Sequence, residues 1–261
     1  MQWLLQPFED THKLADALER LEIAYSWHKV VPFVGDLIPE PDIIDRGSVI
    51  LFGSYTLWRY AEAHALKPGV FKIAPFLYEA AWHEHLLNGT NARVLTLRDV
   101  PDQLADDVQA WFLRPVDDSK AEPGSVKSAS DIIKLATTVL TLDENDIPRG
   151  SLRHDTQLML CQPAHILKEW RLWIVNGEIV THSLYKEGAR VVYRPDIDDD
   201  ALQFAQHMVD LNPSYSPAYV MDICRTQDGL RLLETNCLNA AGFYAADLLK
   251  LAIAIHTMRM S

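Results

Sequence analysis

The sequence predicts an α+β fold that follows a small α/β unit at the N-terminus. In the last third of the chain, residues 168–185 and 218–236 have the pattern of β-hairpins, and helices are expected at 198–211 and 243–258. In the first third, short apolar strands alternate with helices. The 261 residues permit one large domain or two small ones, and a hydrophobic fraction of 48% is ample for a core.

The first hundred residues supply the elements of the α/β unit. Three leucines recur at helical spacing and predict a short amphipathic helix over residues 11–24. The further elements expected here are a strand at 28–34, a loop at 36–45, a buried strand at 48–52, a helix at 54–65 and a helix at 76–87. Ser54 fits the N-cap of its helix, although a strand, a Gly-Ser pair and a helix in succession could also bind an anion. We expect this unit to span residues 1–105.

The middle of the chain carries shorter elements. Those expected are a strand at 111–115, a loop at 116–126, a helix capped by Ser130 or Asp131, a strand at 157–162 and a short strand at 190–193. Pro115 and Pro163 end the two longer strands, because proline lacks the N–H that a strand ladder needs.

Composition and charge narrow the functional classes. The net charge of −12 argues against nonspecific binding to nucleic acid or to an anionic membrane, although a local basic pocket remains compatible with it. Cys161, Cys224 and Cys237 show no Cys-x-x-Cys spacing, so we expect no disulfide framework and a reduced, cytoplasmic setting. No apolar run approaches the roughly 18 residues of a membrane span. The N-terminus lacks the basic stretch of a signal peptide.

Several common catalytic motifs are absent from the sequence. It contains no GxxxxGK[ST] phosphate loop, no GxGxxG and no G-x-S-x-G nucleophile elbow. His83 and His85 lie in a Trp-His-Glu-His run, but residues two apart on a helix do not share a face. This spacing argues against a zinc site.

The second predicted hairpin brings acidic side chains together. If residues 227–229 form a three-residue loop with Gly229 in the left-handed conformation, Asp222 falls directly opposite Glu234. Asn236 then follows on the same face. Two carboxylates and an amide oxygen suit a hard cation such as Mg²⁺. A two-residue Asp-Gly turn would put the carboxylates on opposite faces, and a strand pair with a solvated outer face is the simpler alternative.

The first predicted hairpin turns at Asn-Gly, a strong two-residue turn signal. One face is apolar and the other carries Glu169, Arg171, His182 and Lys186, with Arg171 opposite His182. Arginine and lysine bind phosphates and carboxylates. Cations beside a carboxylate pair are what the chemistry of a nucleoside triphosphate with magnesium requires. A solvated strand face remains the alternative here too.

Four ordered segments carry a family resemblance. They are Phe112-Leu113-Arg114-Pro115 with Asp118-Ser119-Lys120, then Leu160-Cys161-Gln162-Pro163 leading to Glu169-Trp170-Arg171, then Ser183-Leu184-Tyr185-Lys186, and finally Val220-Met221-Asp222 with Leu233-Glu234-Thr235-Asn236, Gly242-Phe243-Tyr244 and Asp247. From Trp111 onward, the chain resembles the ATP-grasp superfamily, and within it a group of small ATP-grasp proteins common in phages and bacteria. Residues 1–105 resemble only loosely the α/β domain that precedes this fold.

The resemblance implies two α+β lobes that grip ATP between them, a central lobe at 106–165 and a C-terminal lobe at 166–261. Members of the superfamily typically join a carboxylate to an amine through an acyl-phosphate and release ADP and phosphate. The cofactors implied are therefore ATP and Mg²⁺. The partners implied are a carboxylate acceptor and an amine nucleophile, with a peptide or protein end as one option.

The resemblance also assigns roles to individual residues. Contacts with ATP would come from Arg114 (in place of the usual lysine), Lys120, the backbone at Cys161 and Gln162, and Arg171. The other roles are catalysis by Arg171 and Lys186, Mg²⁺ binding by Asp222, Glu234 and Asn236, and substrate binding by Arg190, Arg194 and Asn239. The loop after Arg114 has only Gly124 where many relatives are glycine-rich, and no acidic residue stands beside Gln162 for a ribose contact.

Three functions are therefore compared. The first is an ATP-dependent ligase that forms a C–N bond. The second is a kinase-like phosphoryl transfer on the same scaffold, and the third is a nucleotide-binding or interaction protein without turnover. The products separate the first two, since a ligase yields an amide with ADP and a kinase yields a stable phosphorylated product. The sequence does not identify the acceptor, the nucleophile or the oligomeric state.

Overall fold

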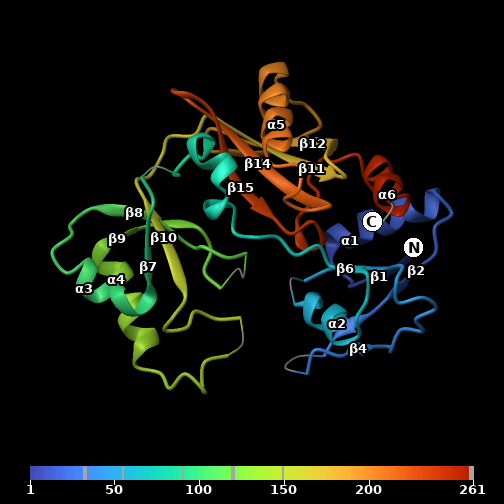
Figure 1. Ribbon diagram of the computed structural model, residues 1–261, viewed down its shortest axis with the longest axis horizontal. Coiled ribbons are helices and arrows are strands. Elements are labelled where there is room, and N and C mark those ends of the chain that lie inside the picture. Colours follow the sequence, from blue (N-terminus) through green and yellow to red (C-terminus); the bar gives the residue numbers. More distant parts are fainter. Residues whose placement is uncertain (32–33, 55, 90, 119–120, 149, 259–261) are drawn as a thin grey trace. The chain divides into compact units, whose positions relative to one another are not determined.

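The computed structural model describes residues 1–31, 34–54, 56–89, 91–118, 121–148 and 150–258 (Figure 1). Its strands and helices confirm the predicted α+β class and divide into two compact units. The first unit joins the two ends of the chain, Met1–Ile73 and Ile166–Ser261, and the second unit is the intervening segment Ala74–His165. No helix within the described ranges is long and apolar enough to cross a membrane.

The N-terminal part of the first unit is a parallel four-stranded sheet. In the order β2-β1-β5-β6, its strands are Tyr25–Trp27, Gln2–Leu5, Val49–Phe52 and Pro68–Gly69. The remaining elements of this part are the paired strands β3 (Lys29–Val30) and β4 (Leu37–Ile38) and the helices α1 (Glu9–Arg20) and α2 (Leu57–Ala63). Helix α1 is the amphipathic helix that the leucine spacing predicts, since Leu14 and Leu18 are fully buried. The helix expected to open at Ser54 begins instead at Leu57.

The C-terminal part of the first unit is an antiparallel five-stranded sheet. In the order β13-β12-β11-β14-β15, its strands are Arg190–Arg194, Glu178–Glu187, Lys168–Val175, Ala218–Thr226 and Gly229–Asn236. Helix α5 (Asp199–Leu211) packs on β12, β14 and β15, whereas α6 (Leu248–His256) packs on β11 and β12 (Figure 1). Strand β11 is buried from its second residue to its last, so the middle of this sheet is shielded from water.

One hydrophobic core joins the two parts of the first unit. It contains Trp3 of β1 and Leu14 of α1 together with Trp173 of β11, Val220 of β14 and Leu251 of α6, all with no exposed surface. Helices α1 and α6 are also in direct contact. The beginning and the end of the chain therefore fold as a single body.

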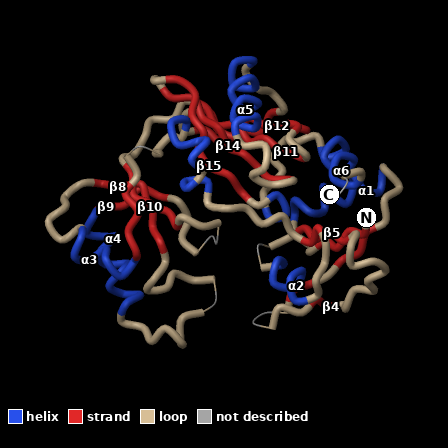
Figure 2. Tube along the Cα trace, in the orientation of Figure 1, coloured by secondary structure: helices blue, strands red, loops and turns tan. Residues whose placement is uncertain are grey.

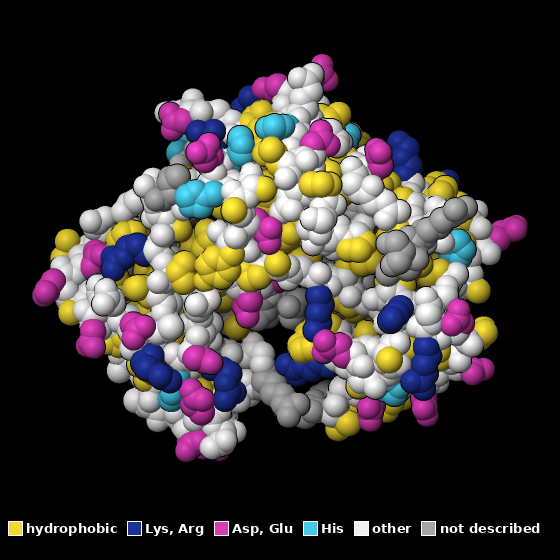
Figure 3. All heavy atoms as spheres, in the orientation of Figure 1, with side chains coloured by type: hydrophobic (Ala, Val, Ile, Leu, Met, Phe, Trp, Pro, Cys, Tyr) yellow, Lys and Arg dark blue, Asp and Glu magenta, His cyan; other side chains and the backbone are white. Residues whose placement is uncertain are grey.

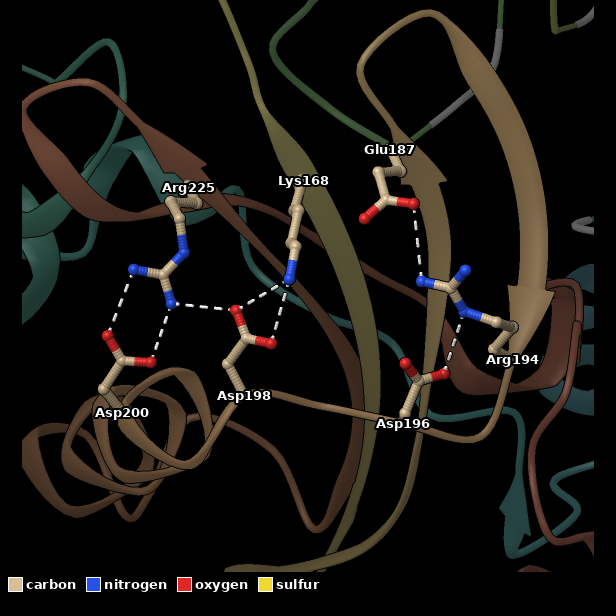
Figure 4. A network of polar contacts seen from close by, with 7 residues as sticks. All are labelled: Lys168, Glu187, Arg194, Asp196, Asp198, Asp200 and Arg225. Atoms are coloured by element: carbon tan, nitrogen blue, oxygen red, sulfur yellow. Dashed lines mark hydrogen bonds and ion pairs between the residues drawn. The ribbon is translucent and has the colours of Figure 1, made fainter.

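Charged side chains fasten the N-terminus of α5 to the sheet (Figure 4). Lys168 of β11 lies 3.0 Å from Asp198, which caps the helix. Arg225 of β14 lies 3.1 Å from Asp198 and 2.7 Å from Asp200. The two cations also stack on the ring of Trp170, each 5.6 Å from its centroid. Carboxylates are favoured at a helix N-terminus by the helix dipole, and here they also hold the helix against two strands.

The second unit is built on an antiparallel sheet with helices beside it (Figure 2). In the order β7-β10-β8-β9, its strands are Arg93–Thr96, Gln157–Cys161, Ala110–Pro115 and Ser125–Ser128, and its helices are α3 (Val100–Gln103) and α4 (Ala129–Leu140). The N-cap of α4 is Ser128, whose Oγ accepts from the N–H of Asp131 at 3.1 Å, rather than the predicted Ser130 or Asp131. The helix expected at 76–87 consists of two short 3₁₀ segments, Phe76–Tyr78 and Ala80–His85.

The compact units divide the chain differently from the expected boundary at residue 105. Strand β7 pairs along its length with β10, from Thr96 opposite Gln157 to Arg93 opposite Leu160. This pairing places residues 74–105 in the second unit. The expected division between residues 165 and 166 coincides with the boundary between the units.

The surface charge is spread rather than gathered. On the face drawn in Figure 3, acidic and basic side chains are interspersed among uncharged ones. The net charge of −12 therefore does not form one acidic patch on this face.

Candidate active site on the C-terminal sheet

The hairpin β14–β15 places three polar side chains on one face. The chain turns in a two-residue loop, with Thr226 opposite Gly229, and not in the predicted three-residue loop. A bulge then inserts Leu233 as an extra residue, so that Asp222 still lies opposite Glu234. The predicted pairing of the carboxylates is thus confirmed, although the loop that was expected to produce it is not the one observed.

The hairpin β11–β12 contains two bulges, and they correct the predicted register. Val175 lies opposite Glu178 as the Asn-Gly turn predicts, but the first bulge follows within three residues and shifts the pairing. Arg171 therefore faces Ser183, and His182 lies opposite Leu172 on the other face of the sheet. The placement of His182 beside Arg171 was wrong, because the turn residues carry no information about a bulge further along the strands.

A buried ion pair forms the centre of the site. Arg171 donates from Nε to Oδ1 of Asp222 at 2.8 Å and from Nη2 to Oδ2 at 2.6 Å, a bidentate contact between neighbouring strands. Arg171 is 7% exposed and Asp222 is 0% exposed. The third guanidinium nitrogen donates to the carbonyl of Gly242 at 3.5 Å. This geometry fixes the plane of the guanidinium group in a nearly dry environment.

Burial and pairing act in opposite directions on these two groups. Burial acts to lower the pKa of Arg171, but the attraction and hydrogen bonds of Asp222 outweigh it and hold that pKa above its ordinary value. Burial raises the pKa of Asp222 to about 6, even though Arg171 acts to lower it. Each charge is therefore kept in the protein by its partner.

Glu234 and Asn236 complete the polar face of β15. Nδ2 of Asn236 lies 3.1 Å from Oε1 of Glu234 and 3.4 Å from Oδ2 of Asp222. Oε1 of Glu234 is also 4.0 Å from Nη2 of Arg171, and the glutamate side chain is 24% exposed. The structure thus brings together the three residues predicted to bind Mg²⁺, at the edge of the buried ion pair.

These residues fit a hard divalent cation by the chemistry of their donors. Within the described part of the chain, no group of three His, Cys, Asp or Glu side chains is arranged to hold a metal, so a site here depends on the amide of Asn236. The amide now turns its nitrogen towards the carboxylates, and a half-turn would present its oxygen instead. Asp222 would keep its contacts with Arg171 and offer a remaining lone pair.

Aromatic rings surround the guanidinium group. The central carbon of Arg171 lies 4.8 Å from the ring of Tyr244 and 5.6 Å from the ring of Tyr185. Tyr244 stacks on Tyr185 at 5.1 Å and on Tyr193 at 5.0 Å. The sequence analysis gave these tyrosines no role. Tyr185 and Tyr244 lie within the family motifs, but Tyr193 of the edge strand β13 carried no signal.

Lys186, predicted to be catalytic, is held by a second buried carboxylate. Its Nζ donates to Oε1 of Glu169 at 2.6 Å, and the hydroxyl of Tyr185 donates to Oε2 of the same carboxylate at 2.7 Å. Glu169 stands two residues before Arg171 on β11 and therefore shares its face. The two predicted catalytic cations thus belong to one polar face.

A cavity of about 370 Å³ adjoins this face within the first unit. Its walls come from the start of α1, the end of β5, the segment 239–244 and Tyr193. Asn239, predicted to bind substrate, lines the cavity, but its amide donates to the carbonyl of Leu51 at 2.7 Å and accepts from the N–H of Phe71 at 2.8 Å. Its side chain therefore ties the N-terminal sheet to the segment after β15.

The two other predicted substrate residues lie on the edge strand β13. Arg190 is exposed opposite Glu187, and Arg194 pairs with Glu187 at 3.4 Å and Asp196 at 3.3 Å (Figure 4). Neither arginine is among the residues that line the cavity. Tyr193, which stands between them in the sequence, does line it.

The residues predicted to contact ATP from the other lobe lie in the second unit. The guanidinium of Arg114 lies over the ring of Phe76 at 5.2 Å, and Gln162 donates to Gln109 at 2.7 Å. Cys161 is buried, and burial raises the pKa of its thiol to about 11, which leaves it protonated and unreactive. Lys120 lies outside the described residues.

Comparison with known proteins supports the resemblance found in the sequence. The model of an ATP-grasp domain family, the third family of its clade, matches residues 61–254. No curated protein matches this sequence.

Solved structures show the same fold over nearly the full chain. The D-cycloserine synthetase DcsG matches with a TM-score of 0.61 and 16% identity, covering 98% of this chain and 99% of that one. The D-alanine–D-alanine ligase from Bacillus anthracis complexed with ATP matches with a TM-score of 0.57 and 10% identity, covering 98% and 97%. The ATP-grasp ligase PsnB, complexed with precursor peptide PsnA2 and AMPPNP, gives 0.52 and 14%, covering 97% and 95%.

Proposed function

Because the chain belongs to this family of ATP-grasp domains, we propose that it is an ATP- and Mg²⁺-dependent ligase that joins a carboxylate to an amine through an acyl-phosphate. The observation that carries the proposal is the buried Arg171–Asp222 pair beside Glu234 and Asn236. Removing two charges from water costs free energy, so a fully buried pair at the rim of an acidic face points to a chemical role.

The roles of the residues follow from their positions. Asp222, Glu234 and Asn236 would hold Mg²⁺, which supplies charge neutralisation at the phosphates when bound. Arg171 presents a fixed guanidinium group that stabilises charge developing on the transferred phosphoryl group and on the acyl-phosphate. Its aromatic neighbours Tyr185 and Tyr244 exclude water, which strengthens that interaction and limits hydrolysis of the intermediate.

Further contacts with ATP would come from the second unit. Arg114, Lys120 and the backbone at Cys161 and Gln162 keep the roles that the family resemblance assigns to them. Two α+β lobes that meet around a nucleotide would bring these residues to the phosphates and the adenine.

The substrates are proposed by chemical class. PsnB, which has the same fold, has been solved with a precursor peptide and separately with Mg and ADP, so a peptide or protein end is a reasonable acceptor to test first. The cavity at segment 239–244 and the edge strand with Arg190 and Arg194 would hold the carboxylate and the amine. The three cysteines are free and buried, which is compatible with a reducing, cytoplasmic setting.

Calorimetry with ATP tests the nucleotide part of the proposal. We expect the native chain to bind ATP more tightly with Mg²⁺ than without it, and Glu234→Ala to lose that difference. Glu178→Ala is the matched control, because Glu178 is an exposed carboxylate at the far end of the same sheet. Equal binding with and without Mg²⁺ in the native chain would contradict the metal assignment.

A screen of carboxylates and amines tests the ligase part. The expected products are an amide, ADP and phosphate in equal amounts. A stable phosphorylated product without amide would show kinase-like transfer instead.

A further inference from the structure

A buried carboxylate outside the proposed metal site holds two side chains at once. Glu169 is 6% exposed, yet each of its oxygens has one strong donor, Lys186 at 2.6 Å and Tyr185 at 2.7 Å. Lys186 itself is partly open to solvent, with 41% of its side chain exposed. The carboxylate therefore restrains a lysine that would otherwise move freely at the protein surface.

A β-bulge makes this arrangement possible. Glu169 lies opposite Lys186, but the next residue of β11, Trp170, lies opposite Leu184, so Tyr185 is the extra residue. In a regular strand, neighbouring side chains point to opposite faces. The bulge breaks that alternation and allows Tyr185 and Lys186, adjacent in the sequence, to reach the same carboxylate.

The tyrosine connects this carboxylate to the catalytic arginine. The ring of Tyr185 lies 5.6 Å from the guanidinium carbon of Arg171 and stacks on Tyr244. Burial and the nearby carboxylates raise the pKa of Tyr185 well above its ordinary value, so its hydroxyl stays protonated and continues to donate to Glu169. A shift of the Glu169 side chain would therefore move both a ring beside Arg171 and the ammonium group of Lys186.

We propose that Glu169 is a positioning residue, which fixes the ammonium group of Lys186 and the ring of Tyr185 on the face that carries Arg171. The inference rests on the proposed function for its catalytic meaning, since Lys186 would act on the substrates or on the phosphates of ATP. Glu169 does not itself touch a reacting atom in this account. Its contribution is to keep two groups where the reaction needs them.

The first test uses the free protein and needs no substrate. An amine-reactive reagent is applied briefly, and labelling of Lys186 is followed by mass spectrometry in the native chain, Glu169→Gln and Glu187→Gln. We expect labelling of Lys186 to be about tenfold faster in Glu169→Gln, because the charged acceptor is lost. Glu187→Gln is the matched control, since Glu187 follows Lys186 directly but pairs with Arg194. An unchanged rate in Glu169→Gln would overturn the proposal.

Two further variants guard against misfolding. Glu169→Asp keeps the charge but withdraws it by one methylene, and Tyr185→Phe removes only the hydroxyl that Glu169 holds. Their melting curves show whether each variant is folded before it is labelled. We expect faster labelling of Lys186 in Glu169→Asp and a smaller change in Tyr185→Phe.

The second test is a double-mutant cycle on MgATP binding. Glu169→Gln and Lys186→Met should each weaken binding about tenfold, and the double variant should bind no more weakly than Lys186→Met alone. If the losses multiply to about a hundredfold, Glu169 does not act through Lys186 and the proposal fails. If the native chain does not bind MgATP at all, the proposed function fails, while the labelling result still decides whether Glu169 positions Lys186.

Discussion

Two arginine–carboxylate contacts on neighbouring strands of one sheet differ in nearly every respect except chemistry. Arg171 and Asp222 form a bidentate pair that is almost completely buried. Arg225 and Asp200 also form two hydrogen bonds, at 2.7 and 3.1 Å, but near the surface, where they fasten α5 to the sheet. The comparison shows that ion pairing alone does not mark a functional site. Burial of the charges, beside further acidic and aromatic groups, does.

The largest expected effect comes from breaking the buried pair. Arg171→Met removes one partner and leaves Asp222 as an uncompensated charge in a dry environment. We expect a loss of about 3–5 kcal/mol in the free energy of unfolding and no detectable turnover. Urea denaturation and an ADP-release assay measure the two effects. A loss in stability below about 1 kcal/mol, the range of a surface pair, would contradict the comparison.

Replacing both partners separates stability from function. We expect Arg171→Met combined with Asp222→Leu to recover most of the stability that the single variant loses, because apolar side chains fill the site without charges to desolvate. Mg²⁺-dependent ATP binding should remain absent. Recovery of that binding in the double variant would mean that the pair does not serve the reaction.

The two pairs should respond to pH with opposite sign. Asp200 has a pKa lowered from 3.8 by its hydrogen bond with Arg225, so its contribution to stability is present above 3.8 and is lost as the pH falls through the lowered value. Asp222 has a pKa raised by burial from 3.8 to about 6, so the folded state favours its protonated form. Its contribution is therefore present below 3.8 and is lost as the pH rises through about 6.

Unfolding curves measured without divalent ions from about pH 3 to about pH 7 check this difference. The stability gap between the native chain and Asp222→Asn should shrink as the pH rises through this range. The gap between the native chain and Asp200→Asn should grow instead. Parallel changes in the two gaps would contradict the opposite environments assigned to these carboxylates.

The smallest expected effect comes from the exposed pair. Arg225→Gln should cost about 0.2–1 kcal/mol of stability, and raising the salt concentration should reduce that cost. MgATP binding should be unchanged, because Arg225 lies with Asp198 and Asp200 at the start of α5. Thermal unfolding at low and high salt, together with calorimetry, provides the measurement. A salt-independent loss would indicate that packing on Trp170 matters more than charge.

The sequence predicted the polar face of β14–β15 better than it predicted how that face is formed. Asp222, Glu234 and Asn236 were expected together because of their spacing, and they do lie together. The expected three-residue loop is absent, and a bulge at Leu233 restores the pairing. In β11–β12, the turn was predicted correctly but a bulge moved His182 to the other face. Turn residues report on the turn, whereas a bulge depends on packing that the local sequence does not reveal.

Long-range pairing was the other limit. The α+β class followed from local patterns, and the ATP-grasp resemblance from ordered motifs. The association of residues 74–105 with the second unit depends on β7 pairing with β10, two strands far apart in the sequence. The tyrosines around Arg171 come from β12, β13 and the segment after β15, so no single stretch of sequence could show that they meet. The predicted role of Lys120 stays a prediction, since this residue lies outside the described ranges.

The division of the first unit between the two ends of the chain has a consequence for biosynthesis. The N-terminal sheet emerges first from the ribosome, but its core requires Trp173, Val220 and Leu251, which are translated much later. The segment Ala74–His165 is continuous and has its own hydrophobic core. During synthesis, the inserted unit can therefore complete its core early, while the earliest strands wait for the last helix before their apolar surface is covered.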